Sequence, residues 1–323
     1  MKASVIGTGS ALPKTVVKND DFKQWVDTDD EWIYSHTGIK ERRIAKDETL
    51  ISLAADAAKK ALADAGVSGE EIDLIIAATF TPDCFTPTLA CMLQNEVGAT
   101  CPAFDLNAAC SGFIYALDVG YRYIKSGAAK KVLIVAADML SRVTNFSDRG
   151  TCVLFGDGAG AAVLSAQGEG NIIYSKTEAE SDTKFSLRIP GLYSRFPLNE
   201  SLPKEESVVS MDGNEIYMNA VRTMTRDIKK ALSESGLTIS DIDYIVPHQA
   251  NSRIIDAVAI KLKMLKEKFF MNMPKYGNTS AASVAIALDE LSKSGMLRKG
   301  THVALCAFGG GFTSGCAILE WAK

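Results

Sequence analysis

The segment KKALADAGVSGEEIDLIIAA at Lys59–Ala78 decides the fold, because KKALSESGLTISDIDYIV at Lys229–Val246 matches it without gaps. Each copy has an amphipathic run that ends at a glycine, Gly66 or Gly236, and then a short loop and an apolar stretch. This pattern is typical of a helix with a glycine C-cap that leads into a buried strand. Helices that alternate with fully apolar strands indicate α/β layers with mainly parallel sheets.

The repeat continues beyond these two segments. Ala116-Leu117-Asp118 recurs as Ala287-Leu288-Asp289, and the strand expected at Val132–Ala137 recurs as Val303–Phe308. The sequence therefore predicts two similar α/β halves.

We place the two halves at residues 1–165 and 211–323. The interval 166–210 is richer in Ser, Glu, Pro and Gly and shows weak periodicity. We expect it to be a connection with a surface excursion.

The composition is that of an ordinary globular protein, with 323 residues, 47% hydrophobic and 23% charged. The formal net charge of −4 provides no overall basic surface for nucleic acid or a membrane. The longest apolar runs have strand length and are too short to span a bilayer. No HExxH motif or other metal-ligand spacing is present. We therefore expect no nucleic acid, membrane or metal partner.

The seven cysteines are odd in number and include no CxxC pair. The N-terminal residues hold no apolar stretch long enough for a signal peptide. Free thiols are typical of a reducing compartment, so we expect a cytoplasmic protein.

Cys110 is the strongest candidate nucleophile. It follows the apolar run 102–107 and precedes a periodic apolar segment that ends at Ser126-Gly127, which predicts a strand, a tight turn and a helix. The thiol then lies at the helix N-terminus, where unpaired N–H groups and the helix dipole favour a thiolate. These N–H groups and the dipole can lower the pKa of a cysteine thiol from about 8.5 into a range of roughly 3.5–7.5.

Two further candidates lie at the ends of predicted elements in the second half. His248 follows the strand expected at 244–247, and Asn278 precedes a helix in Gly-Asn-Thr-Ser. His248 is either catalytic or a loop residue that satisfies nearby backbone groups. Asn278 on its own is typical of a helix N-cap. The two halves would bring both residues to the face of Cys110, where α/β sheets usually bind ligands.

Two glycine-rich runs allow different interpretations. Gly309–Gly315 follows a predicted buried strand and fits either a tight turn or an oxyanion hole made of backbone N–H groups. Gly156–Ala161 formally fits the dinucleotide pattern GxGxxA. It precedes a strand instead of joining a strand to a helix, so we reject a dinucleotide site.

Several motifs together carry a family resemblance: Asp30–Ile33, Ala108–Phe113, Phe155–Gly160, Pro247–Asn251, Tyr276–Ser280 and Ala307–Gly311. In these motifs the chain resembles the condensing enzymes of the thiolase superfamily, and most closely the 3-oxoacyl-[acyl-carrier-protein] synthase III family. The resemblance covers nearly the whole chain. It implies a thiolase-like α/β fold, with two similar halves stacked as α-β-α-β-α layers.

The resemblance also implies a reaction. Cys110 would take the acyl group from a short acyl-CoA, and malonyl-acyl-carrier protein would lose CO₂ to form an enolate that attacks the acyl-cysteine. His248 and Asn278 would donate hydrogen bonds to the enolate oxygen, and the N–H groups of Cys110 and Gly310 would form the oxyanion hole. No cofactor is needed. The product, a 3-oxoacyl-acyl-carrier protein, would initiate fatty acid biosynthesis.

The family's coenzyme A site maps onto seven residues: Trp32, His36, Arg149, Asn214, Tyr217, Ala250 and Asn251. Many members have an arginine at the position of His36. The acyl pocket maps onto Phe85, Thr86 and Phe308. Thr86 stands where some members have a phenylalanine that shortens this pocket, so we expect chains longer or more branched than acetyl to fit.

The resemblance implies two macromolecular partners. Family members are homodimers in which residues near Phe85 reach the partner's acyl pocket. The acyl-carrier protein is acidic, and a basic patch for it maps onto Arg253, Lys261, Lys263 and Lys266.

Four alternatives compete with this function. Two are a synthase III-like enzyme that serves secondary metabolism and a cysteine hydrolase that uses His248 as a base towards water. A non-catalytic binding relative is disfavoured, because Cys110, His248 and Asn278 are all present. A biosynthetic thiolase is disfavoured, because Ala307 stands where that family has a second cysteine. Cys306 is one residue away, which on a strand turns it to the other face.

Overall fold

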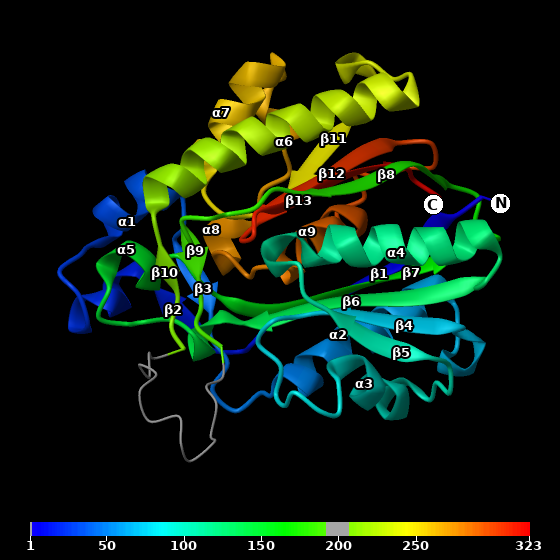
Figure 1. The fold of residues 1–323 in the computed structure, drawn as a ribbon, viewed down its shortest axis with the longest axis horizontal. Helices are drawn as coiled ribbons and strands as arrows, with labels where there is room; N and C mark the ends of the chain where they lie inside the picture. The colour runs from blue at the N-terminus through cyan, green and yellow to red at the C-terminus, as the bar shows by residue number, and fades with distance from the viewer. Residues whose placement is uncertain (1, 192–206) are drawn as a thin grey trace.

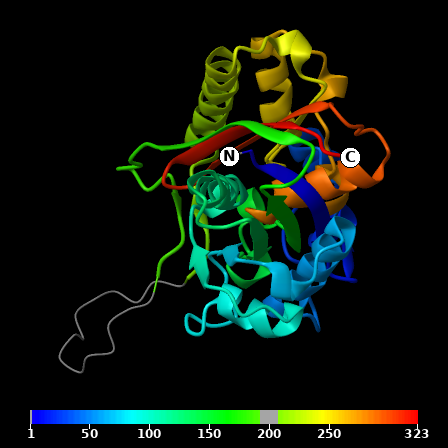
Figure 2. The same cartoon turned by 90° about the vertical axis from the view of Figure 1, so that its right-hand side faces the viewer.

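The computed structural model describes residues 2–191 and 207–323. Two β-sheets alternate with three layers of helices (Figure 1). Figure 2 shows the layers from the side, with one sheet under the uppermost helices and the other above the lowest ones. This is the α-β-α-β-α layering that the family resemblance implies.

The strands form two main sheets and two small ribbons. In the first sheet the order is β1 (Ser4–Ala11), β7 (Asp157–Ser165), β6 (Lys131–Met139), β4 (Leu74–Ala78) and β5 (Ala103–Leu106). In the second it is β8 (Asn171–Ala179), β13 (Thr313–Glu320), β12 (His302–Gly309) and β11 (Tyr244–Pro247). The ribbons pair β2 (Val16–Lys18) with β3 (Glu41–Arg43), and β9 (Leu187–Arg188) with β10 (Ser210–Met211).

Helices cover the outer faces of both sheets and fill the space between them. The first sheet carries α2 (Leu50–Ala65) and α3 (Leu89–Val97), the middle layer is α4 (Gly112–Ser126) and α9 (Ala282–Lys293), and the second sheet carries α6 (Gly213–Ser235) and α7 (Ser252–Leu262). The shorter helices are α1 (Asp30–Thr37), α5 (Arg149–Cys152) and α8 (Met273–Tyr276). Within the described residues, none of the helices combines the length and apolarity that crossing a bilayer requires.

β6 shows why the first sheet needs helices on both faces. Ile134 and Ala136 pack into the core between the two sheets, whereas Leu133 and Val135 pack in the core beneath α2. Alternate side chains of a strand point to opposite faces. An unbroken apolar run is therefore buried only when an apolar layer lies on each side.

The two sheets share their strand order and strand directions. β1, β7, β6 and β4 correspond to β8, β13, β12 and β11, and in each set the first two neighbouring pairs are antiparallel and the last pair is parallel. The repeat seen in the sequence is thus a repeat of the backbone. The expectation of mainly parallel sheets is wrong, because β7 and β13 each run against both neighbours.

The second half begins earlier than the sequence suggests. Asn171–Ala179, which lies in the interval expected to be a connection, forms β8 and pairs with β13. β8 is the counterpart of β1, so it belongs to the second half. It is an edge strand whose last residues are half-buried or exposed, which explains its weak apolar pattern. Residues 192–206 of the same interval lie outside the described residues.

The halves meet where α4 and α9 begin. A Cβ at Gly112, the first residue of α4, would lie 2.9 Å from the Ala78 Cβ at the end of β4 and 3.0 Å from the Ala281 Cβ before α9. The glycine therefore permits the two helix starts to pack closely. The residues that precede each helix are brought to one place, and these include Cys110 and Asn278.

Candidate active site

Two cavities meet at Cys110. One, which we call the histidine cavity, has a volume of about 500 Å³ and is lined by residues of both halves, among them Cys110, His248, Asn278, Phe308, Trp32, His36, Asn214, Tyr217, Ala250, Asn251 and Arg253. The other, the apolar cavity, has a volume of about 530 Å³ and is lined mainly by Phe80, Phe85, Leu140, Val143, Phe155, Leu187, Ile189 and Val209, with Arg142, Asn107 and Gly310. Cys110 borders both, so its sulfur can meet groups from either side.

Cys110 lies in a short 3-10 turn, Ala109–Ser111, that runs directly into α4. Ala109 has a φ of 46°, which is in the left-handed region. The Asn107 side-chain oxygen accepts a hydrogen bond from the Ala109 N–H at 3.1 Å. The turn holds the thiol at the start of the helix, as the sequence predicts.

The glycine run approaches this turn closely. A Cβ at Gly309 would lie 2.7 Å from the backbone nitrogen of Cys110 and 3.1 Å from that of Ser111. A side chain at this position would displace the turn, so the space in front of the Cys110 N–H is left free. Gly310 borders the apolar cavity beside Cys110.

The pKa of Cys110 differs from the expectation. Burial raises the pKa of the thiol to about 12, the hydrogen bond from Ser280 opposes this rise, and the charge of Asp138 adds to it. The Ser280 hydroxyl oxygen lies 3.5 Å from Sγ. A thiol with this pKa is protonated at neutral pH.

His248 is held as a neutral imidazole. Its backbone N–H donates to the Cys306 carbonyl within β12, and Phe308 packs edge-on against its ring at a centroid distance of 5.7 Å. Burial lowers the pKa of His248 to about 3. Nδ1 lies 2.7 Å from the Ser283 hydroxyl, which already accepts a hydrogen bond from the Gln249 N–H. This arrangement favours donation from Ser283 to Nδ1, which leaves the imidazole proton on Nε2.

Asn278 is oriented by its own turn. Its side-chain oxygen accepts from the Ser280 N–H at 2.8 Å, and its backbone pairs with Leu154 and Gly156. Ala281, rather than Asn278, is the N-cap of α9. Because the Asn278 oxygen is occupied, its amide NH₂ group is the part that can donate to a ligand in the histidine cavity.

Trp32 forms the mouth of the histidine cavity with two basic side chains. The His36 ring stacks on the Trp32 ring at 4.5 Å, and the Arg149 guanidinium lies 4.5 Å from the same ring. The Asn251 amide donates to the His36 carbonyl at 3.0 Å, which ties α1 to the start of α7. Six of the seven residues predicted to bind coenzyme A therefore line the histidine cavity. The seventh, Arg149, lies next to them through its contact with Trp32.

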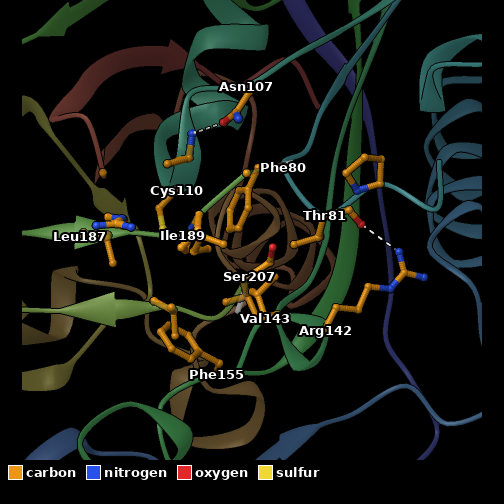
Figure 3. A pocket seen from close by; sticks show the side chains of 18 of the residues that line it. Phe80, Thr81, Asn107, Cys110, Arg142, Val143, Phe155, Leu187, Ile189 and Ser207 are labelled. Carbon is orange, nitrogen blue, oxygen red and sulfur yellow. Dashed lines mark hydrogen bonds between the residues drawn. The ribbon is translucent and has the colours of Figure 1, made fainter. Parts of the chain in front are cut away.

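Figure 3 shows the apolar cavity, with Phe80 and Ile189 near Cys110 and with Val143 and Phe155 farther along its wall. Arg142 lies at its edge, where it donates to the Thr81 carbonyl at 3.0 Å and pairs with Asp83.

Two of the residues predicted for the acyl pocket do not line the apolar cavity of this chain. Phe308 lines the histidine cavity beside His248, because alternate residues of β12 face opposite sides. Thr86 is not among the residues that line the apolar cavity, whereas its neighbour Phe85 is.

The four predicted basic residues differ in their partners. Arg253 donates to the Ser35 carbonyl at 2.9 Å, and Lys266 pairs with Asp256 at 2.6 Å. Lys261 and Lys263 are exposed at the end of α7. Among the described residues, no cluster of three or more His, Cys, Asp or Glu could hold a metal ion.

Three polar residues beside the site were not singled out from the sequence: Asp138, Ser280 and Ser283. Asp138 ends the apolar run of β6, and a carboxyl group at the end of a buried strand is a usable signal. Ser280 lies in the Gly-Asn-Thr-Ser motif, although no feature of the motif shows that it reaches Cys110. Ser283 gives no signal, because its contact with His248 depends on how α9 packs.

Comparison with known proteins identifies the family. The family model described as 3-oxoacyl-[acyl-carrier-protein] synthase III matches residues 104–182, and the model of its C-terminal part matches residues 232–321. The beta-ketoacyl-[acyl-carrier-protein] synthase III of Clostridium acetobutylicum is 47% identical over 320 residues, which cover 99% of this chain and 98% of the relative.

Solved structures agree with the sequence matches. The 3-oxoacyl-[acyl-carrier-protein] synthase III of Aquifex aeolicus has a TM-score of 0.92 and 45% identity, and covers 99% of this chain and 100% of that one. The priming beta-ketosynthase from the R1128 polyketide biosynthetic pathway has a TM-score of 0.90 and 35% identity, and covers 99% and 97%. Likeness at this identity over the full length of both chains reflects a common family. The chain belongs to the beta-ketoacyl-[acyl-carrier-protein] synthase III family.

Proposed function

We propose that Cys110, His248 and Asn278 are the catalytic residues of this enzyme. The enzyme is an acyltransferase that condenses a short acyl-CoA primer with malonyl-acyl-carrier protein and so initiates fatty acid biosynthesis. The observation that most supports the residue roles is that the three side chains, which come from both halves, line one cavity.

In the first step Cys110 Sγ bonds to the carbonyl carbon of the acyl-CoA, and the bond from that carbon to the coenzyme A sulfur breaks. The carbonyl oxygen carries negative charge in the tetrahedral intermediate. The N–H groups of Cys110 and Gly310 stabilise this charge, and Gly309 keeps the approach open.

In the second step malonyl-acyl-carrier protein loses CO₂, and the enolate carbon attacks the acyl-cysteine. The enolate oxygen accepts hydrogen bonds from His248 Nε2 and the Asn278 amide. Decarboxylation forms the carbanion without removing a proton, so the step needs hydrogen-bond donors rather than a base. A neutral His248 suits this role, because it donates without having to be charged.

The two cavities divide the substrate between them. The coenzyme A part of the primer occupies the histidine cavity, with its adenine at Trp32 and Arg149. The acyl chain occupies the apolar cavity, and a volume of about 530 Å³ supports primers longer or more branched than acetyl. No cofactor is assigned.

Exposed side chains and free cysteines support the proposed partners and compartment. Lys261 and Lys263 are the exposed members of the basic patch and would meet the acidic carrier protein. Phe85 is 71% exposed at the rim of the apolar cavity, which supports a homodimer that covers it.

All seven cysteines are free thiols, which supports a reducing compartment such as the cytoplasm.

A second candidate function is priming in polyketide-type synthesis. The likeness to the priming beta-ketosynthase of the R1128 pathway, at 35% identity, favours it. The chemistry at Cys110 would be the same, and the acyl chain or the carrier protein would differ.

The test is intact-mass measurement after incubation with acetyl-, isobutyryl- and longer acyl-CoAs, followed by malonyl-acyl-carrier protein. We expect an acyl adduct that Cys110→Ala loses and that malonyl-acyl-carrier protein discharges as 3-oxoacyl product. Cys91→Ala, which removes an exposed thiol, is the control and should keep the adduct. An adduct discharged only by water would support a hydrolase, and one discharged only to a polyketide-pathway carrier would support the second candidate.

A further inference from the structure

Asp138 is a buried carboxyl group for which the condensation has no use. It follows the apolar run of β6 and is 0% exposed. Its oxygens accept from the hydroxyls of Thr79 and Thr81 at 3.1 and 2.9 Å, and from the N–H groups of Phe80 and Ala281 at 3.1 and 3.3 Å. These four donors are uncharged. A buried carboxylate with neutral partners is costly and often has a functional role.

Ser280 connects Asp138 to the nucleophile. Its hydroxyl donates to Cys110 Sγ at 3.5 Å, and a hydrogen bond from the same hydroxyl lowers the pKa of the neighbouring Asp138 carboxyl group. The hydroxyl carries one proton and can turn, so when Ser280 donates to Asp138 instead, its oxygen can accept the thiol proton. Ser280 is fully buried with a φ of 52°. Such strained conformations of non-glycine residues persist at functional sites, where the surroundings hold them.

His248 is less suited to take this proton. Burial lowers its pKa to about 3, so the imidazole resists the positive charge that it would acquire. Among the described residues, Ser280 and not His248 forms the side-chain hydrogen bond to Cys110 Sγ.

Transfer to Asp138 also avoids a second buried negative charge. If Cys110 lost its proton to water while Asp138 stayed ionised, two negative charges would share one buried site. If the proton moves to Asp138, the negative charge moves from carboxylate to sulfur and the number of charges is unchanged. Burial raises the pKa of Asp138 to about 6, so the carboxyl group is ionised at neutral pH and can accept.

We infer that Ser280 and Asp138 form a proton relay for Cys110, in which Ser280 contacts the sulfur and Asp138 is a positioning residue that acts through Ser280. The inference rests on the proposed acyl transfer.

The protons that the relay moves balance over the acylation and condensation steps. As Sγ attacks the acyl carbon, its proton passes to Ser280 and the Ser280 proton passes to Asp138. Coenzyme A leaves as a thiolate and takes a proton from water. When condensation breaks the C–S bond, the sulfur regains a proton by the reverse path and Asp138 is ionised again. The single proton taken from water is the one that the overall reaction consumes.

Other titratable groups near the relay have partners of their own. Asp157, on the neighbouring strand β7, accepts from the N–H and hydroxyl of Ser141. Arg142 pairs with Asp83. His248 is bound to Ser283 on α9. None of these contacts reaches Asp138 or Ser280.

The test is single-turnover acylation of the full-length enzyme by acetyl-CoA between pH 5 and 9, followed by intact mass. Asp138→Asn keeps the side-chain size but cannot take the proton. Asp157→Asn is the matched control, since it changes another fully buried carboxyl group in the same sheet.

We expect the wild-type rate to rise up to about pH 6 and then level, because the relay works once Asp138 is ionised. Asp138→Asn should be about 100-fold slower at pH 7. Its rate should continue to rise with pH, because the thiol must then lose its proton to water. Asp157→Asn should keep the wild-type profile.

Ser280→Gly tests the same path if Asp138→Asn does not fold. Glycine tolerates the φ of 52° and lacks the hydroxyl. It should give the profile of Asp138→Asn, and the double variant should be no slower than either single variant, because one path is lost in each.

Unchanged rates and profiles in Asp138→Asn and Ser280→Gly would overturn the relay. So would faster acylation of Asp138→Asn at pH 7, because Asp138 would then act on Cys110 through its charge alone. Absence of an acyl adduct on wild-type Cys110 would be a failure of the proposed function, which this readout separates from a failure of the relay.

Discussion

The two halves of the molecule share one backbone plan but differ where a strand of one half meets a helix start of the other. β6 leads to Asp138, and the corresponding position of β12 is Gly309. Asp138 accepts from the Ala281 N–H before α9, whereas Gly309 packs against the Cys110 backbone nitrogen before α4. One helix N-terminus is thus satisfied by a carboxyl group of the protein, and the other is kept open. In the proposed mechanism, the open one leaves room for a substrate oxygen.

The turns before the two middle helices differ in the same way. Ala109 and Ser280 stand at corresponding positions of the repeat and have φ values of 46° and 52°. In the first half this turn presents Cys110, the proposed nucleophile. In the second half it presents the Ser280 hydroxyl to the Cys110 sulfur. Duplication of one scaffold has therefore produced two helix starts with complementary chemistry.

The largest expected effect is on the condensation rate, and it tests whether the two halves have different chemical roles. Asn278→Ala should slow condensation about 1,000-fold, because a donor to the enolate is lost. Acylation of Cys110 should stay within about twofold of wild type. Rates of acyl-enzyme formation and of 3-oxoacyl product formation, measured separately, check this. An equal loss in both steps would mean that the halves do not divide the chemistry.

A second prediction concerns the open helix start. Gly309→Ala would place a Cβ 2.7 Å from the Cys110 backbone nitrogen, and acylation should fall about 100-fold. Gly158→Ala is the control, because its new Cβ would mainly meet the movable ends of Ile286 and Leu12. Single-turnover acylation and thermal melting distinguish a local effect from a general loss of stability. Normal acylation in Gly309→Ala would show that the open space is not needed.

A third prediction compares the charges on α7 and α3, the corresponding outer helices of the two halves. α7 ends with exposed Lys261 next to Lys263, whereas its counterpart α3 carries Glu96 and no lysine or arginine. Lys261→Glu should raise the KM for malonyl-acyl-carrier protein about fivefold at low salt, with no change in the KM for acyl-CoA. Lys59→Glu, at a basic residue on the other outer face, serves as the control. Equal effects of the two substitutions would argue against a patch on α7.

The smallest expected effect is on stability. Burial raises the pKa of Asp138 from 3.8 to about 6, so between about pH 4 and 6 the folded protein keeps a proton that the unfolded chain releases. Protonation of this group therefore favours the folded state as the pH falls through that window. The Tm difference between wild type and Asp138→Asn should shift in favour of wild type by a few degrees from pH 7 to pH 5. A pH-independent difference would show that the carboxyl group titrates normally.

Most of the layered fold can be predicted from the sequence, because repeated helix caps and apolar strands are local signals. Strand direction cannot be read from the same signals. β7 is as apolar as β6, and only the pairing shows that it runs the other way. β8 was missed because an edge strand need not be apolar along its whole length.

The three catalytic candidates lie in recognisable motifs, but their chemical state does not follow from those motifs. The helix dipole predicts a low pKa for Cys110, yet burial and Asp138 raise it. Asp138 and Ser280 reach the sulfur from segments far apart in the chain. Such long-range contacts set the environment of the thiol, and a single sequence does not give them.

The position of Cys110 between two cavities also fixes the order of events. In the proposed mechanism both thioesters reach the same sulfur through the histidine cavity, whose volume is about 500 Å³. Coenzyme A must therefore depart before the malonyl carrier enters, while the acyl chain waits in the apolar cavity. We therefore expect ping-pong kinetics, with parallel double-reciprocal plots. Free coenzyme A should compete with malonyl-acyl-carrier protein for the acyl-enzyme, so a rising ratio of coenzyme A to acyl-CoA should slow the first condensation of a new chain.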